Sequence, residues 1–155
     1  MNGCLETSAD REQEWLRQAA EDGHAPAMHA YGLQCIVHEH RRRWLRAAAR
    51  EGYVPAMYDY GLCCDDSKQK IYWLRMAAQE GHLRAMYLLG MECDDPGERR
   101  RWLKLAAEEG HVPAMYEFAL RCNDLHEKRR WLAEAARNGY QAAMLEWDIE
   151  GPSRS

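Results

Sequence analysis

The sequence is poor in β-branched residues and in Phe, all of which favour β-strands. Its 155 residues include three Val, three Ile, one Thr and one Phe. Ala, Leu, Arg, Glu and Met are abundant instead, and these residues have high helix propensity. The composition predicts an all-α fold and argues against an enzyme built on a β-sheet.

Long apolar runs are also missing. No stretch approaches the ~20 apolar residues that cross a membrane. Residues 1–6 lack the basic region followed by an apolar run that begins a signal peptide. We therefore expect a cytoplasmic protein. The 21 basic and 25 acidic residues give a formal net charge of −4, which disfavours a general nucleic-acid or membrane-surface binder.

A period of 29 residues runs through the chain. Five tryptophans are spaced by this period: Trp15, Trp44, Trp73, Trp102 and Trp131. A Leu follows each Trp, and Ala-Ala, Gly and Ala-Met recur with the same step. This agreement identifies a repeat array, which we treat as a single domain over 8–150. Its copies are 8–36, 37–65, 66–94, 95–123 and 124–150, and we expect flexible tails at 1–7 and 151–155.

Each copy carries the signals of two helices. In the fourth copy, Asp95 is the expected N-cap of a longer helix that ends at Gly110, where a left-handed residue is needed. Pro113 then begins a shorter helix. Because few residues separate the helices, neighbouring helices must run antiparallel. The sequence predicts an all-α, right-handed α-solenoid of about five stacked antiparallel helical hairpins.

One repeat position holds a small residue in four of the five copies. It holds Gly32, Gly61, Gly90, Ala119 and, in the last copy, Asp148. A small residue lets the next helix pack tightly, and we expect the Trp column to fill the space beside the Ala-Ala pairs. Since no helix follows Asp148, we interpret it, with Glu146 and Glu150, as a polar cap on the end of the array.

The pattern Trp-Leu-x-x-Ala-Ala-x-x-Gly-His-x-x-Ala-Met-Tyr-x-Leu-Gly, at residues 73–90, resembles the Sel1-like repeat family. That family consists of helical hairpins related to tetratricopeptide repeats. The copies here are shorter than is usual in the family, because a loop is reduced to Cys-Asp-Asp or its equivalent. The resemblance implies a non-catalytic scaffold that binds other proteins, of a kind frequent in bacteria as adaptors and as regulators of secretion or toxins.

The six cysteines are expected to be reduced. Four of them share one repeat position: Cys35, Cys64, Cys93 and Cys122. Packed helix layers lie ~8–10 Å apart, whereas a disulfide needs Cα atoms within about 7 Å. Cys35, His38 and His40 have the spacing of metal ligands, as do Cys122 and His126. The other copies do not supply the four converging ligands of a structural zinc site, and we predict no metal and no cofactor.

Catalytic motifs are scarce. The sequence has no Gly-rich phosphate loop, nucleophile elbow or HExxH helix. Cys63 and Cys64 precede Asp65 and Asp66, and neighbouring acids raise the pKa of a thiol rather than lowering it. We predict that the chain is not an enzyme.

Basic residues cluster in the first half of the longer helices. The candidates for a basic edge are Arg42, Arg43, Arg100, Arg101, Arg129 and Arg130. Three explanations stay open: salt bridges to the Asp caps of neighbouring loops, docking to an acidic protein surface, and binding of RNA or DNA. Nucleic acid is the least favoured, because stacking aromatics interleaved with the basic residues are lacking except at Tyr72.

The shorter helices supply the candidate binding surface. In helical-hairpin solenoids they line the concave face, and here several of their columns differ from copy to copy, as a surface matched to one asymmetric partner would. The candidates are Tyr58, Asp59, Tyr87, Leu88, Glu92, Tyr116, Glu117 and Arg121. The alternative for the three tyrosines is that they pack between hairpins.

The sequence therefore predicts a monomeric protein-interaction scaffold or adaptor that binds one partner protein on its concave face. A narrower hypothesis is a bacterial immunity protein or inhibitor of a toxin or effector. The alternative function is binding of nucleic acid or another polyanion through the basic edge.

Overall fold

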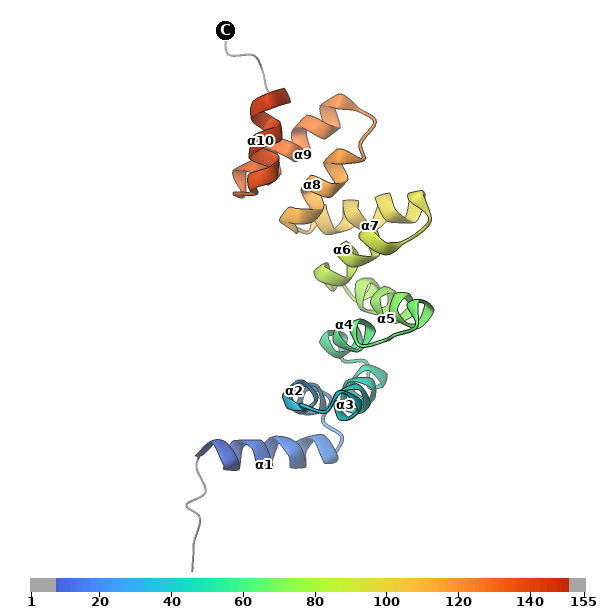
Figure 1. Cartoon of the computed structure of the whole chain (residues 1–155), viewed down its shortest axis with the longest axis vertical. Coiled ribbons are helices and arrows are strands. Elements are labelled where there is room, and N and C mark those ends of the chain that lie inside the picture. The colour runs from blue at the N-terminus through green and yellow to red at the C-terminus, as the bar shows by residue number, and fades with distance from the viewer. Residues whose placement is uncertain (1–7, 151–155) are drawn as a thin grey trace, which may run out of the picture. The chain divides into compact units, whose positions relative to one another are not determined.

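The computed structural model describes residues 8–150, apart from the side chains of residue 10 and residues 147–150. This part of the chain forms ten α-helices and no β-strand (Figure 1). The helices are α1 (Ser8–Glu21), α2 (Ala25–Gln34), α3 (His38–Arg50), α4 (Val54–Leu62), α5 (Ser67–Gln79), α6 (Leu83–Glu92), α7 (Pro96–Glu108), α8 (Val112–Leu120), α9 (Leu125–Arg137) and α10 (Gln141–Glu150). The expected flexible tails, and the side chains of Asp148 and Glu150 in the expected cap, lie outside the described residues.

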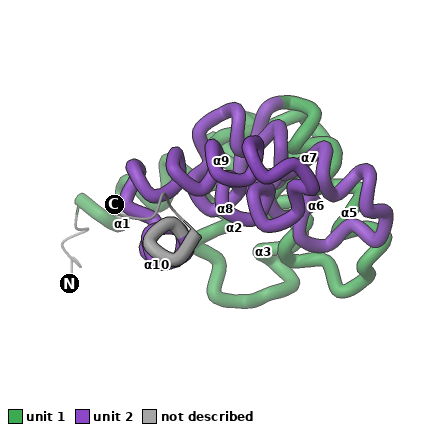
Figure 2. Tube along the Cα trace, turned by 90° about the horizontal axis from the view of Figure 1, so that it is seen from above, with its two compact units in different colours: residues 1–80 green, residues 81–155 purple. Residues whose placement is uncertain are grey.

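Longer and shorter helices alternate, with 13 or 14 residues in α1, α3, α5, α7 and α9 and 9 or 10 in the others. In the described residues, none of these helices combines the length and the apolar character that a membrane span requires. The chain divides into two compact units, residues 1–80 with α1 to α5 and residues 81–155 with α6 to α10 (Figure 2). Within each unit, every helix packs against the next one along the chain. The predicted all-α fold of helical hairpins is confirmed.

The beginnings of several helices follow local sequence signals. Asp66, Asp95 and Asp124 cap α5, α7 and α9, because each carboxylate accepts a hydrogen bond of 2.7–3.0 Å from a backbone N–H two or three residues later. His82 and His111 cap α6 and α8, where Nδ1 accepts at 3.3 Å from the backbone N–H three residues later. The predicted N-cap at Asp95 is confirmed.

A glycine in the left-handed region follows each longer helix. The five glycines have φ between +82° and +91°. After α7, the N–H of Gly110 donates to the carbonyl of Ala107 at 3.1 Å, and the N–H of His111 donates to the carbonyl of Ala106 at 2.9 Å. These two bonds form a Schellman motif, which satisfies the last carbonyls of α7 and turns the chain into α8.

In the core of each unit, two repeat positions face each other: the Leu that follows each Trp and the small residue of the shorter helices. The leucines that follow Trp are fully buried at Leu45, Leu74, Leu103 and Leu132. An added Cβ at Gly90 would lie 2.5 Å from Leu103 Cγ, and one at Gly61 would lie 3.4 Å from Leu74 Cγ. The small-residue column therefore lies where a shorter helix meets the next longer one, as predicted.

The tryptophan column lies beside these contacts. The rings of Trp44, Trp73 and Trp131 each meet an aromatic ring of the preceding shorter helix edge-on, with centroids 5.4–5.8 Å apart. Trp131 is 7% exposed, whereas Trp15 is 79% exposed. The expectation that the Trp column fills the core is wrong for Trp15, because α1 is the first described helix and no described shorter helix precedes it to cover the ring.

Replacing two tryptophans at the same repeat position should give different losses of stability. Trp131→Ala should lower the free energy of unfolding by ~3–5 kcal/mol, because it truncates a buried aromatic side chain. Trp15→Ala should cost less than ~1 kcal/mol, because the ring is already exposed. Urea denaturation followed by circular dichroism measures both values, and equal losses would contradict the exposure of Trp15.

The glycine contacts can be tested by adding a methyl group. Gly90→Ala should lower the free energy of unfolding by about 1–3 kcal/mol, because the new Cβ overlaps Leu103. Gly61→Ala is the matched control: its Cβ would be at ordinary contact distance, and Ala favours a helix over Gly by up to about 1 kcal/mol. Thermal unfolding should leave Gly61→Ala unchanged or more stable, and a stabilised Gly90→Ala would refute the close contact.

Candidate functional site

The shorter helices carry one partly exposed face at three repeat positions, spaced i, i+3 and i+4 so that the side chains lie on one side of the helix. In the first unit these are Ala30, Leu33 and Gln34 from α2 and Asp59, Leu62 and the C-cap Cys63 of α4; in the second they are Leu88, Met91 and Glu92 from α6 and Glu117, Leu120 and the C-cap Arg121 of α8. Every one of these residues is half-buried or exposed. We call this set the short-helix face and describe it unit by unit.

The middle position of the short-helix face is an exposed apolar column. Leu33 and Leu62 in the first unit are 47% and 46% exposed, and Met91 and Leu120 in the second are 38% and 42% exposed. This column could not be recognised as exposed from the sequence alone, because an apolar residue repeated at helical spacing usually indicates core. The sequence does contain a sign of this exposure, because the two repeat positions that flank the apolar column hold residues that differ between copies. Among the predicted residues, half-buried Leu88 and exposed Glu92 flank Met91.

Charged candidates beside this column are paired within their own unit. The Asp59 carboxylate lies 2.7 Å from Nε2 of His29 on α2. Nη1 of Arg121 donates to the backbone carbonyl of Glu117 at 2.7 Å and also pairs with the Glu117 carboxylate. The pairs hold these polar side chains in fixed places next to the apolar column.

The candidate tyrosines make internal contacts. Tyr58 is buried. The Tyr87 ring lies 4.7 Å from the ring of His111, the N-cap of α8, and burial raises the pKa of Tyr87. The hydroxyl of Tyr116 donates to Glu146 on α10 at 2.9 Å, and burial followed by this bond raises the pKa of Tyr116. Tyr87 and Tyr116 thus contact the next hairpin, which is the packing role that the sequence left open.

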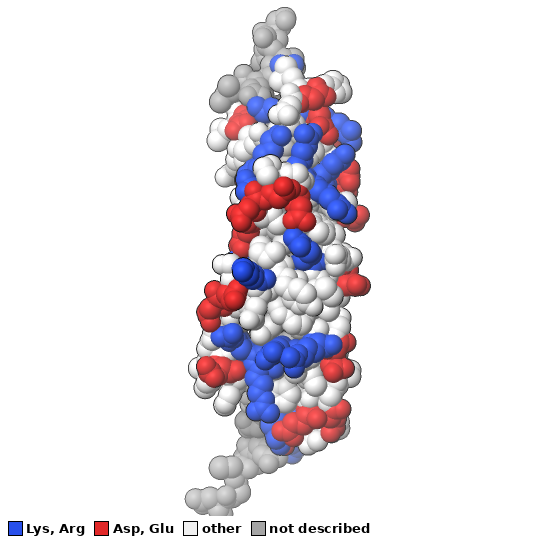
Figure 3. All heavy atoms as spheres, turned by 90° about the vertical axis from the view of Figure 1, so that its right-hand side faces the viewer, with Lys and Arg blue, Asp and Glu red and all other residues white. Residues whose placement is uncertain are grey.

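Two arginines of the predicted basic edge form ion pairs, Arg42 within its own copy and Arg100 with the next copy. Arg42 is 3.0 Å from Asp65 in the first unit, and Arg100 is 3.2 Å from Glu127 in the second. Figure 3 shows Lys and Arg gathered over α3 in the first unit and over α7 and α9 in the second, with acidic side chains beside them. The guanidinium group of Arg101 lies over the ring of Trp102, 5.8 Å from its centre, and that of Arg130 lies over the ring of Trp131 at 5.4 Å. Arg43 and Arg129 are exposed.

The arginines one position before this edge have a structural role that the sequence analysis missed. Arg41 donates to the carbonyl of Cys35 at 3.0 Å, and Arg99 donates to the carbonyl of Cys93 at 2.7 Å. Each cysteine is the C-cap of the preceding shorter helix, where carbonyls lack intrahelical donors. These bonds fasten the end of one hairpin to the start of the next.

The arrangement of the helices is also found in proteins of known structure. No family model matches this chain, and no curated protein matches it. It is similar to a protective antigen of uropathogenic Escherichia coli that displays an SLR fold, with 26% identity and a TM-score of 0.83 over 88% of this chain. It is also similar to a Sel1 repeat protein from Oxalobacter formigenes, with 25% identity and a TM-score of 0.76 over 88% of this chain. The chain is an SLR-type repeat protein.

The family and the α-solenoid class predicted from the sequence are thereby confirmed. This SLR-type repeat protein spans 35% of the Escherichia coli chain and 65% of the Oxalobacter formigenes chain. The similarity therefore covers most of this chain and only part of each of the two others.

Three cysteines of the SLR-type repeat protein, Cys63, Cys64 and Cys122, are poor nucleophiles. Burial is the main cause of a raised pKa at Cys63, Cys64 and Cys122. The pKa of Cys122 rises to about 11, and the negative charge of Glu127 contributes to this rise. A thiol with a raised pKa carries little thiolate near neutral pH. Within the described residues, no group of three His, Cys, Asp or Glu side chains could hold a metal ion.

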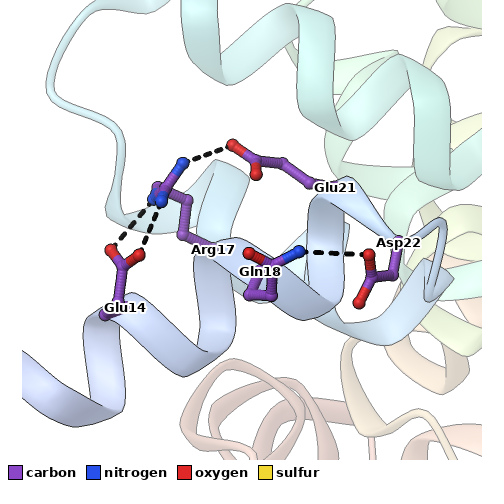
Figure 4. Close-up of polar contacts among 5 residues, drawn as sticks. All are labelled: Glu14, Arg17, Gln18, Glu21 and Asp22. Atoms are coloured by element: carbon purple, nitrogen blue, oxygen red, sulfur yellow. Dashed lines mark hydrogen bonds and ion pairs between the residues drawn. The ribbon is translucent and has the colours of Figure 1, made fainter.

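A further surface surrounds the exposed Trp15 on α1. Arg17 lies between Glu14 and Glu21, with nitrogen–oxygen distances of 2.5 Å to each (Figure 4). The hydrogen bond from Arg17 lowers the pKa of Glu14. A groove of about 510 Å³ beside the ring is lined by Glu14, Trp15, Gln18, Ala19 and Asp22. This side of the first repeat therefore combines an apolar ring with a charged rim.

Cys122 should react slowly with iodoacetamide. Its pKa of about 11 leaves far less thiolate at mildly alkaline pH than an ordinary thiol of pKa about 8.5 has. The rate should rise about tenfold per pH unit up to that pKa, because only the thiolate reacts. Peptide mass spectrometry of the alkylated protein measures this rate. Glu127→Gln should speed the reaction, and a rate equal to that of free cysteine in the unaltered protein would contradict the raised pKa.

Proposed function

We propose that this SLR-type repeat protein is a non-catalytic scaffold that binds a partner protein through the short-helix face. SLR repeat proteins are generally protein-interaction scaffolds. The observation that carries the proposal is the apolar column of this face, which recurs from copy to copy and stays 38–47% exposed. An apolar column that served only the core would be buried in the free protein, as the leucines after Trp are.

The three positions of the short-helix face would contribute differently to binding. Full burial of a Leu or Met side chain contributes ~1.5–3 kcal/mol, so removing the remaining exposed part contributes on the order of 1 kcal/mol per residue. The flanking positions carry different residues in each copy, such as Glu92 on α6 and Arg121 at the end of α8. Such a pattern favours one partner over others, since a wrong partner would leave charges unpaired.

The narrower form of the proposal is an immunity protein or inhibitor that covers a toxin or effector. In that form the scaffold acts as a cytoplasmic monomer and binds on a concave face. Its support is the similarity to bacterial SLR structures.

Polyanion binding through the basic edge has less support. Arg42 and Arg100 are held in ion pairs, and Arg101 and Arg130 lie over tryptophan rings. An incoming polyanion would have to compete with these internal contacts. We therefore keep the short-helix face as the proposed binding surface.

Leu120→Glu should disrupt the proposed complex. Tagged protein isolated from its native cells should retain a stoichiometric partner, and the variant should bind the purified partner at least about tenfold more weakly, a loss of ~1.4 kcal/mol or more. The reason is that a carboxylate would be buried against apolar surface. Isothermal titration calorimetry measures the affinity.

Leu125→Glu is the matched control for this experiment. Leu125 is also exposed, but it begins the longer helix α9 and lies outside the short-helix face. Circular dichroism should give the same helix content for both variants. Loss of binding in both variants, or in neither, would argue against the short-helix face as the binding surface.

A further inference from the structure

Helix α3 has an unusual concentration of positive charge. Its 13 residues include five Arg and a single acid, Glu39. Four of these arginines occupy positions 42, 43, 46 and 50, whose spacing places them on one side of the helix. All four line a groove of about 430 Å³ together with Glu39, Ala47 and Tyr60.

Most of this charge is not neutralised by the residues that the structure describes. Arg42 pairs with Asp65 at 3.0 Å. Arg43, Arg46 and Arg50 are exposed, and in the part of the chain that the structure describes no carboxylate pairs with them. The groove therefore presents at least three guanidinium groups to solvent.

The corresponding positions of the other longer helices do not repeat this arrangement. On α7, Glu108 takes the position of Arg50 and pairs with Lys104 at 3.8 Å. On α9, Ala133 takes the position of Arg46. Like charges four residues apart destabilise a helix, so helix stability does not account for the arginines of α3.

We propose that the arginine groove of α3 binds an acidic segment of the partner protein. The inference rests on the proposed function, because it assigns a second, charged contact to the same complex. A guanidinium group presents a planar fork of donors that matches the two oxygens of a carboxylate. The contact of Arg42 with Asp65 already places a carboxylate on this row of arginines.

A short acidic peptide fits the groove better than a nucleic acid does. The charge is confined to one groove of about 430 Å³ that also contains Glu39, and the whole chain carries a net charge of −4. A long polyanion would be repelled by much of the remaining surface. Half-buried Ala47 in the lining offers apolar surface beside the arginines.

The probe for this proposal is a deca-glutamate peptide titrated into the full chain, with calorimetry as the measurement. We expect saturable binding of one peptide per chain that weakens as salt is added, since screening increases with ionic strength. Arg46→Glu combined with Arg50→Glu should weaken this binding at least tenfold. The milder double variant Arg46→Lys and Arg50→Lys keeps the positive charges but removes the paired guanidinium donors. It should weaken peptide binding less than the double Glu variant does.

The matched control is Lys104→Glu combined with Arg137→Glu. These residues occupy the repeat positions of Arg46 and Arg50 on α7 and α9, and both are exposed. The control makes the same change in net charge and should alter peptide affinity by less than twofold. Equal weakening by the two pairs, no saturable peptide binding, or tighter binding of an oligothymidylate of equal length would each overturn the proposal.

The test separates this inference from the proposed function. Leu120→Glu lies outside the groove and should leave deca-glutamate binding unchanged. If the groove fails to bind the peptide while Leu120→Glu still releases the partner, only the inference falls. If Leu120→Glu leaves partner binding intact while the peptide binds the groove, the assignment of the short-helix face falls instead.

Discussion

The close approach of each shorter helix to the next longer one is the constraint on which the rest of the structure depends. At Gly90 the missing Cβ lets Leu103 lie against the helix backbone, whereas at the same repeat position in the other unit a Cβ at Gly61 would still meet Leu74 at ordinary contact distance. Because both columns recur every 29 residues, the same helix contact recurs within each unit. The core leucines consequently have a similar environment in successive copies, being fully buried from Leu45 to Leu132.

This regularity separates positions that serve the fold from positions that are free to serve binding. Leu103 and Leu132 are constant and buried, as core residues are. Leu120 belongs to a column that is also apolar in every copy, yet it is exposed, and Glu92 and Arg121 share one position with different charges. A constant apolar column flanked by variable polar ones is suited to an interface whose affinity and selectivity come from different residues.

The charged residues divide in a similar way. Arg41 and Arg99 bind carbonyl groups at the ends of shorter helices, and Arg100 pairs with Glu127, so these side chains hold neighbouring hairpins together. On α3 the arginine row continues beyond such contacts, and Arg46 has no ion pair among the described residues. Charge that the fold uses and charge that it leaves available thus occur on the same helix.

The sequence by itself determined the helices, their hairpin pairing and their ends, as at Asp95 and Gly110, because capping and left-handed turns depend on residues only a few positions apart. It could not distinguish exposed Leu120 from buried Leu132, because both are apolar residues in periodic columns. It also could not tell which arginines find a partner in the next copy, or that Trp15 lies in solvent. Burial and pairing depend on which helix lies against a side chain, and only the tertiary structure decides that.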